Sequence, residues 1–276
     1  NMLPQTVISE LQQAAGTAGV LTSPTDLIAY SFDGTFEQSL PDAVVLPEST
    51  EEVAAVVRVA AQHGIPIVPR GMASGLAGGA IPHRGGITLS LTRMNRLIEL
   101  DQENMTVTVE AGMVTADLQK MVERVGLFYP PDPSSIKQST IGGNIACNAG
   151  GPRCLKYGVT GDYVLGLTVV LADGSVLKTG GKAIKNVTGL NLTQLFVGSE
   201  GVLGIITEAT LRLIARPSYA STALVYFSSL DDAACAIHAI LIQGLVPATL
   251  ELLDETAIEC IEEAMHLGLP GDMEAL

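Results

Sequence analysis

The chain has 276 residues, of which 47% are hydrophobic and 16% are charged, so it can bury one large core or two smaller ones. Its net charge of −14 excludes nucleic acid and anionic membrane surfaces as favoured partners, because their phosphates would repel it. No apolar run reaches the ~18 residues of a membrane-spanning helix, and we expect no secretory signal, since the first residues lack its basic and apolar regions.

The N-terminal half alternates between strand and helix patterns. A helix is expected to begin after Ser49, where Glu52 completes a capping box, and to end at Gly64. Further strands and one more helix are expected around it: strands at 43–46, 65–68, 86–91, 97–101 and 106–111, and a helix over about 114–125.

The C-terminal half adds antiparallel pairs. A hairpin is expected over 163–179 with Asp173-Gly174 at its turn, followed by a long strand over 203–214. Residues 217–276 are expected to alternate between strands at 223–227 and 248–253 and helices at 231–243 and 255–265. Because parallel crossovers and antiparallel pairs are both implied, the chain is predicted to have an α+β fold.

The most informative segment is the glycine-rich stretch PRGMASGLAGGA at 69–80, which follows a predicted strand. Glycines at a strand end let backbone N–H groups converge on an anion, and the ligand expected for such a loop is a diphosphate. The usual dinucleotide fingerprint is excluded, because Pro82 and Gly85-Gly86 follow instead of a helix. A P-loop is excluded as well, because it would need Gly-Lys-Ser/Thr at its end. For this motif alone, a tight loop without a ligand is the alternative.

Three further segments have similar chemistry: PPDPSS at 130–135, STIGGNIACNAGG at 139–151 and GSEGVLGIIT at 198–207. They combine small residues, hydroxyls and glycine turns that flat ligands and phosphate oxygens can approach. Each alone is typical of a turn. Together with the first loop they favour a large nucleotide.

The four cysteines and four histidines form none of the spacings of a metal or iron–sulfur site, so no metal site is expected. The cysteines are expected to be free thiols, as in a reducing cytoplasm.

Five segments in this order resemble the PCMH-type FAD-binding domain of the vanillyl-alcohol oxidase superfamily, closest to the glycolate oxidase FAD-binding subunit and the FAD-linked D-lactate dehydrogenases. The matching segments cover about 40 to 216 and lie at 69–80, 130–135, 139–151, 154–164 and 198–213. The resemblance implies an N-terminal helical segment over 1–40 and a two-lobed FAD-binding domain over 41–216, with lobes of about 41–100 and 101–216. Residues 217–276 would begin an α/β substrate or cap domain.

The resemblance also implies which residues bind FAD. Backbone N–H groups of the first loop should hold the diphosphate, with Ser74 adding a hydroxyl: Arg70, Gly71, Met72, Ala73, Ser74 and Gly75. Other positions should approach the ribityl chain and diphosphate (Asp132, Ser139, Thr140), admit the backbone to the cofactor (Gly142, Gly143), face the isoalloxazine (Ala146, Asn148, Ala149) or hold the adenosine half (Glu200, Gly204, Ile205, Ile206).

Two departures from the family pattern concern the first loop. Relatives commonly have Gly-Thr where this chain has Ala73-Ser74, which we expect to weaken binding at most, provided that φ at Ala73 is negative. Members that attach FAD covalently carry a histidine near these positions. Its absence predicts noncovalent FAD.

The activity implied by the resemblance is oxidation of a small 2-hydroxy acid to the 2-oxo acid. A base would take the hydroxyl proton while the hydride goes to flavin N5, and a cation would hold the substrate carboxylate. In the family these groups lie largely in the cap and C-terminal segments, with histidine-rich metal-binding motifs. The chain ends at Leu276 without them, so we expect a C-terminally truncated fragment that binds FAD but turns over poorly.

No catalytic residue is assigned, because Arg153, Lys156 and Tyr157 near the flavin-facing segment are read as solvated surface. Glycolate and D-lactate differ by one methyl group, worth only about 1–3 kcal/mol in a pocket. Partner subunits or an electron-acceptor protein are expected, with a cytoplasmic location or peripheral membrane attachment through such subunits. Two alternatives stay open: an FAD-holding electron-transfer subunit without its own substrate site, and an NADPH-using enolpyruvyl reductase on the same scaffold.

Overall fold

A computed structural model describes residues 3–270 and 273–276, and the chain divides into two compact units. The main unit comprises the chain up to residue 151 together with 159–216, and the C-terminal unit comprises 152–158 and 217–276. Within the described ranges, no helix has both the length and the apolar character needed to cross a bilayer.

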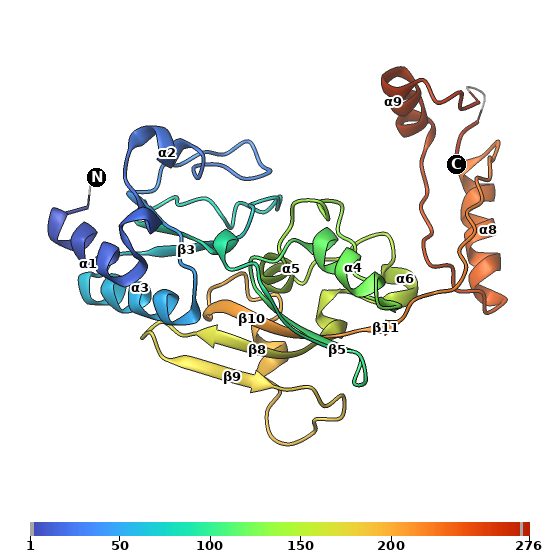
Figure 1. The fold of residues 1–276 in the computed structure, drawn as a ribbon. Helices are drawn as coiled ribbons and strands as arrows, with labels where there is room; N and C mark the ends of the chain where they lie inside the picture. Colours follow the sequence, from blue (N-terminus) through green and yellow to red (C-terminus); the bar gives the residue numbers. More distant parts are fainter. Residues whose placement is uncertain (1–2, 271–272) are drawn as a thin grey trace. The chain divides into compact units, whose positions relative to one another are not determined.

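The first lobe of the main unit is a four-stranded sheet in the order β1-β2-β4-β3. β4 pairs in parallel with β2 and β3, whereas β1 is antiparallel to β2. Figure 1 shows helices α1 and α3 side by side against this lobe. Its elements are α1 (Gln5–Ala15), a 3-10 turn (Thr17–Gly19), β1 (Val20–Leu21), α2 (Pro24–Ile28), β2 (Ala43–Val45), α3 (Thr50–His63), β3 (Ile67–Arg70) and β4 (Ile87–Ser90).

Helix α3 begins and ends where the sequence predicts. The Ser49 hydroxyl accepts the N–H of Glu52 at 3.2 Å, and the Glu52 carboxylate accepts the N–H of Glu48 at 2.7 Å. The reciprocal bond therefore reaches one residue further back than in the standard capping box. Gly64 closes the helix in the left-handed conformation with φ +63°.

The second lobe is an antiparallel sheet in the order β5-β6-β10-β8-β9. The predicted hairpin is present, with Asp173-Gly174 between β8 and β9. Its elements are a 3-10 turn (Leu91–Arg93), β5 (Leu97–Asp101), β6 (Thr106–Glu110), α4 (Thr115–Glu123), β7 (Leu127–Phe128), α5 (Ile141–Cys147), a 3-10 turn (Thr160–Tyr163), β8 (Val164–Val170), β9 (Val176–Gly180), α7 (Leu192–Phe196), β10 (Ile205–Arg212) and β11 (Ile214–Ala215). A mixed sheet beside an antiparallel one, both with helices, confirms the predicted α+β class.

A buried chain of hydroxyls joins the two lobes. Thr50, at the start of α3, donates to the Thr207 hydroxyl at 2.9 Å, and Thr207 donates to the carbonyl of Thr168 at 3.2 Å. Arg58 of α3 also donates to the carbonyl of Gly174 at 3.1 Å. Helix α3 is thereby fixed to both β8 and β10.

Two strand predictions in the main unit need adjustment. The strand expected at 65–68 is β3 at 67–70, because the N–H of Ile65 closes α3 by donating to the carbonyl of Ala60 at 2.9 Å. The strand expected over 203–214 ends at Arg212. A separate strand, β11, then pairs with β7 in a small two-stranded sheet.

The C-terminal unit contains α6 (Cys154–Tyr157), α8 (Leu230–Ile242) and α9 (Glu255–Met265). Ser229 and Asp254 cap the two long helices by accepting the N–H groups of Asp232 and Ala257. The predicted strands at 223–227 and 248–253 are wrong. In the described residues only isolated bridges from Phe227 and Asp254 to Ala275 form, because no neighbouring strand supplies a continuous ladder.

Candidate functional site

Two cavities of the main unit border the glycine-rich stretch. The loop cavity, of about 180 Å³, lies among residues 71–80, the 133–149 segment, Asp33 and Glu200. The strand cavity, of about 60 Å³, lies between the end of β3, helix α5 and the start of β10. Arg70, Gly71, Gly143, Ala146 and Glu200 line both, so the two cavities adjoin.

Sixteen of the eighteen predicted site residues line one or both cavities. The loop cavity includes Arg70, Gly71, Met72, Ala73, Ser74, Gly75, Ser139, Thr140, Gly143, Ala146, Ala149 and Glu200. The strand cavity adds Gly142, Gly204, Ile205 and Ile206. Segments far apart in sequence therefore meet at one place.

Asp132 and Asn148 line neither cavity. The backbone of Asp132 lies so close to Gly151 that a Cβ there would collide with the Asp132 carbonyl. Asn148 ends helix α5 at φ +49°, and its side-chain oxygen accepts the N–H of Gly161 at 2.8 Å. Its side-chain oxygen therefore holds the following loop, and its predicted approach to the isoalloxazine stays a prediction.

Several lining residues were not singled out by the sequence: Asp33, Pro69, Ala77, Gly79, Ala80, Leu91, Pro133, Ser135, Asn144, Cys147 and Gly201. Most lie inside the glycine- and proline-rich segments described above, so the sequence motifs could have identified them as lining residues. Asp33 and Leu91 lie outside these segments, and only the folded chain reveals them.

The backbone of the first loop offers a row of hydrogen-bond donors. Among the described residues, no acceptor is found for the N–H groups of residues 71–75. Consecutive N–H groups without an internal acceptor at a cavity wall form the kind of concave donor array that binds anions, which favours an anionic ligand.

Glycine is required where this loop meets helix α5. A Cβ on Gly71 would collide with the hydroxyl of Thr140, which caps α5 by accepting the N–H of Gly143 at 3.4 Å. The missing side chain at Gly71 thus lets the loop approach the helix closely.

The adjacent glycines of α5 have different roles. Gly142 donates its N–H to the carbonyl of Ala111 at 2.8 Å, and a Cβ at Gly142 would come within 2.6 Å of the Ala111 side chain. The N–H of Gly142 is thus used for packing the helix against the sheet, while Gly142 also lines the strand cavity. A Cβ on Gly143 would meet only the Thr140 hydroxyl, at 3.2 Å.

Ala73 adopts the left-handed conformation with φ +52°, so the condition of a negative φ at this position is not met. A left-handed residue with a Cβ costs about 1–2 kcal/mol. The neighbouring Ser74 hydroxyl donates to Ser135 at 3.0 Å, which joins the first loop to the proline-rich segment across the cavity.

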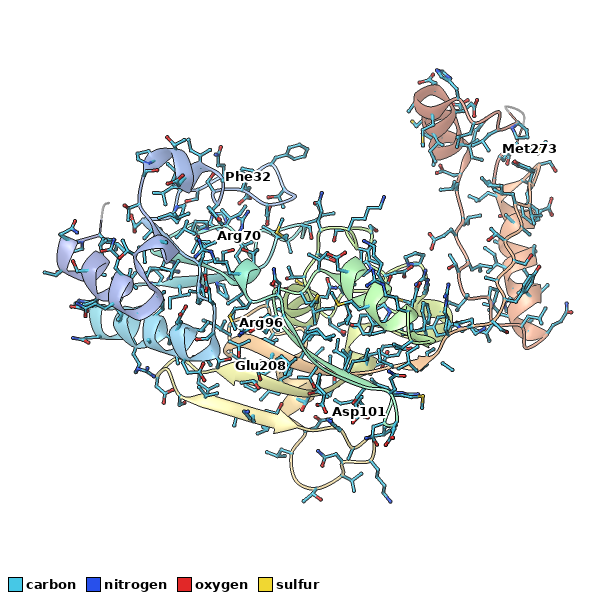
Figure 2. The ribbon with its side chains drawn as sticks, in the orientation of Figure 1. Phe32, Arg70, Arg96, Asp101, Glu208 and Met273 are labelled. Atoms are coloured by element: carbon cyan, nitrogen blue, oxygen red, sulfur yellow. The ribbon has the colours of Figure 1, made fainter. Side chains whose placement is uncertain are left out.

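The Arg70 side chain does not point at a ligand. Arg70 is 8% exposed, and its guanidinium lies over the Tyr30 ring and donates to the carbonyls of Phe32 at 2.7 Å and Tyr30 at 3.2 Å. Figure 2 shows Arg70 beside Phe32. Burial lowers the pKa of this group. Arg70 therefore fixes the segment before Asp33 to the end of β3.

The remaining charges at the cavities are acidic. Among the described residues that line them, Arg70 is the only cation, whereas Asp33 and Glu200 are carboxylates. Burial and the nearby charge of Glu200 raise the pKa of the Cys147 thiol. Binding of an anionic ligand here must therefore depend on backbone N–H and hydroxyl groups.

Comparisons with known proteins agree with this chemistry. A family model described as an FAD binding domain matches residues 41–180, and one described as the C-terminal domain of FAD linked oxidases matches residues 216–276. The chain is 46% identical over 276 residues to the glycolate oxidase subunit GlcD of Bacillus subtilis, covering 100% of this chain and 59% of that protein. It is 41% identical over 223 residues to the D-lactate dehydrogenase of Anaerostipes hadrus, covering 81% of this chain and 47% of that protein.

The chain thus spans about half to three-fifths of the length of these curated relatives. Among solved structures, an alkyldihydroxyacetonephosphate synthase has a TM-score of 0.84 at 24% identity over 99% of this chain and 55% of its own. A p-cresol methylhydroxylase has a TM-score of 0.73 at 23% identity over 86% of this chain and 48% of its own. These two likenesses show the fold. The chain belongs to the FAD binding domain family of PCMH-type, FAD-linked oxidoreductases, and its cofactor is FAD.

Proposed function

We propose that this chain is the FAD-holding part of an enzyme that oxidises a small 2-hydroxy acid, glycolate or D-lactate, to the 2-oxo acid. The names of the similar glycolate oxidase subunit GlcD of Bacillus subtilis and D-lactate dehydrogenase of Anaerostipes hadrus support this substrate class. Bound FAD would supply the hydride acceptor for the oxidation. The chain's own residues bind and orient this cofactor.

The observation that carries the proposal is the row of N–H groups at residues 71–75, which line the loop cavity without an acceptor in the described part of the chain. Each charge-assisted hydrogen bond to a diphosphate oxygen would contribute about 1.5–3 kcal/mol. The position of Ala73-Ser74, where covalent members carry a histidine, supports noncovalent attachment.

The visible spectrum of the purified chain tests this proposal, before and after incubation with FAD and removal of the excess. A retained flavin spectrum, with intact FAD released on denaturation, is the expected result. A colourless chain whose circular dichroism shows a cooperatively folded α+β protein would overturn the proposal.

We further propose that the chain binds FAD but oxidises the substrate poorly by itself. Arg70 is the only cation among the described residues that line the two cavities, and its guanidinium is bonded to backbone carbonyls, so a substrate carboxylate lacks a partner there. Anaerobic addition of glycolate or D-lactate to the FAD-loaded chain should leave the flavin oxidised. Rapid bleaching would contradict this part.

The domain boundaries belong to the same proposal: an N-terminal segment over 1–40, the FAD-binding domain over 41–216 and the beginning of a cap domain over 217–276. The division of the chain at Arg216 and Pro217 and the two matched family regions support it. A cytoplasmic location is also proposed, supported by four cysteines that form no disulfide.

The missing carboxylate partner also favours a second candidate, an FAD-holding subunit that passes electrons to a partner protein and has no substrate site of its own. Reduction of the flavin by a 2-hydroxy acid in the complete protein would exclude this candidate. Reduction only by a partner subunit would favour it.

A further inference from the structure

The C-terminal unit has almost no hydrophobic core of its own. Among its described residues only three apolar residues are buried, and two of them are alanines. Larger apolar side chains in the segments at 223–227 and 248–253 lie at the surface, where Val225 and Leu252 are 53% and 43% exposed. Apolar side chains that gather at a surface in this way mark a place where a further segment binds.

Both of these segments are bonded at one end to the same short stretch of chain. Phe227 and Ala275 exchange backbone hydrogen bonds, at 2.9 and 3.3 Å, and Leu253 and Leu276 do the same, at 2.9 and 3.0 Å. The bridges from Ala275 to Phe227 and to Asp254 are antiparallel. Two consecutive residues thus direct their backbone groups to opposite sides, as in a central strand between two antiparallel neighbours.

Beyond these pairs the two segments have no backbone partner. Among the described residues, no backbone hydrogen bond is found for residues 223–226 or 248–252. Neighbouring strands lie about 4.8 Å apart, so two segments that flank a shared strand are about 10 Å apart and cannot bond to each other. Each segment therefore presents a row of unpaired N–H and C=O groups, which is a template for an added strand.

The register of the two existing pairs determines where an added strand would bond. In an antiparallel ladder, hydrogen-bonded pairs recur at every second residue. A strand that runs on from Leu276 would therefore bond Val225 and Ala223 on one side and Glu251 and Thr249 on the other.

The same register places apolar side chains on one face. Side chains alternate along a strand, and residues directly opposite each other point the same way. Val225 and Phe227 of the first segment would thus share a face with Leu250 and Leu252 of the second. An added strand with an apolar residue at every second position would complete this face.

We infer that the C-terminal unit is a strand-binding surface whose occupant is a β-strand that runs on from Ala275 and Leu276, between the segments at 223–227 and 248–253. The sequence predicts both segments as strands, and the added strand supplies the partner that each of them lacks. The glycolate oxidase subunit of Bacillus subtilis, of which this chain covers 59%, has the length for such a strand. The inference does not depend on FAD and goes beyond the proposed function.

The test extends the chain after Leu276 by six residues, Val-Thr-Val-Thr-Val-Thr, which places valine on the apolar face. An extension of the same length, Gly-Ser-Gly-Ser-Gly-Ser, is the control, because glycine disfavours strands. Amide hydrogen exchange is followed residue by residue by NMR. Amides of β8 and β10 report in every sample that the main unit is folded.

The valine–threonine extension should slow exchange at four amides, those of Ala223, Val225, Thr249 and Glu251, at least about 10-fold relative to the control extension. The amides between them should stay fast, because their N–H groups point away from the added strand. Equal exchange in the two extended chains would overturn the inference. Protection of the intervening amides instead would overturn it as well, because the register would then be wrong.

Two proline variants of the extended chain test the pairing independently. Val225→Pro removes one of the N–H groups assigned to the added strand, so exchange at Thr249 and Glu251, on the far side of that strand, should become several-fold faster. Leu224→Pro is the matched control, because it removes an N–H that points away from the strand and should leave those amides protected. If both prolines have the same effect, the inferred pairing is wrong.

A second copy of the chain is the other source of a strand. In the chain without an extension, exchange at the four amides should be fast and independent of protein concentration. Protection that grows with concentration would mean that a second copy supplies the strand, which would overturn the assigned occupant.

Discussion

At the scale of single residues, the site contains left-handed backbone conformations that residues with a side chain rarely adopt. Ala73 and Glu200 are both left-handed, and both line the loop cavity. Sequence reasoning located these positions but not their conformations, because φ at a loop residue is set by contacts with segments distant in sequence.

We predict that Ala73→Gly stabilises the chain by about 0.5–1 kcal/mol. Relief of the left-handed strain outweighs the greater freedom of glycine in the unfolded state. Urea unfolding measures the change. Ala77→Gly is the control, since Ala77 lines the same cavity without a positive φ and should be destabilised by a similar amount. Equal effects at both positions would refute the role of strain.

The Cys147 thiol provides a prediction about pH. Its pKa is raised by burial and by the charge of Glu200, so the reactive thiolate is scarce at neutral pH and forms only as the pH rises past the ordinary thiol value. Alkylation of Cys147, followed by mass spectrometry, should therefore be slow at neutral pH. Glu200→Gln should lower this pKa and speed alkylation, and bound FAD should block it. An unchanged or slower rate in that variant would contradict the assignment.

At the scale of elements, local signals predicted well. The Ser49 cap of α3, the Asp173-Gly174 hairpin and helices α8 and α9 follow from nearby residues, and all are present. Helix α5 was interpreted as a turn because its glycines are poor helix formers. It forms because Thr140 caps it and Gly142 packs closely on Ala111.

The strands expected at 223–227 and 248–253 do not form. A strand needs a neighbouring strand to pair with, and the local sequence pattern does not show whether one is present. The same limit applies to the site. Its residues were located from motifs, but the bonds of Arg70 to Phe32 and of Asn148 to Gly161 depend on chain segments that meet only on folding.

The contact between the first loop and α5 makes a prediction about packing. Gly71→Ala should destabilise the chain by about 1–3 kcal/mol, because its Cβ must displace Thr140 from the helix cap. FAD affinity should fall as well. Gly75→Ala is the control, since a Cβ there meets no atom within 4 Å and should leave stability nearly unchanged in thermal unfolding. If the two variants unfold at the same temperature, the close approach at Gly71 is not important for stability.

At the scale of the whole molecule, the protein and its cofactor carry charges of the same sign and repel each other. The chain has a net charge of −14, and FAD carries a negative diphosphate. Long-range repulsion should slow their encounter, and salt should screen it, because the screening length falls from about 30 Å at 0.01 M to about 8 Å at 0.15 M ionic strength. Association of FAD, followed by stopped-flow fluorescence, should therefore accelerate as salt is added. A rate that falls with salt would mean that a local cationic patch attracts the cofactor.

The central claim is that two adjoining cavities, lined by backbone donors and hydroxyl groups, hold FAD. Calorimetric titration of the folded chain with FAD tests it most directly, with FMN and AMP titrated as the two halves. We predict one FAD per chain, with each half binding far more weakly than the whole, because the contacts to the diphosphate and to both halves then act on one ligand. A folded chain that binds no FAD, or that binds FMN as tightly as FAD, would contradict this account.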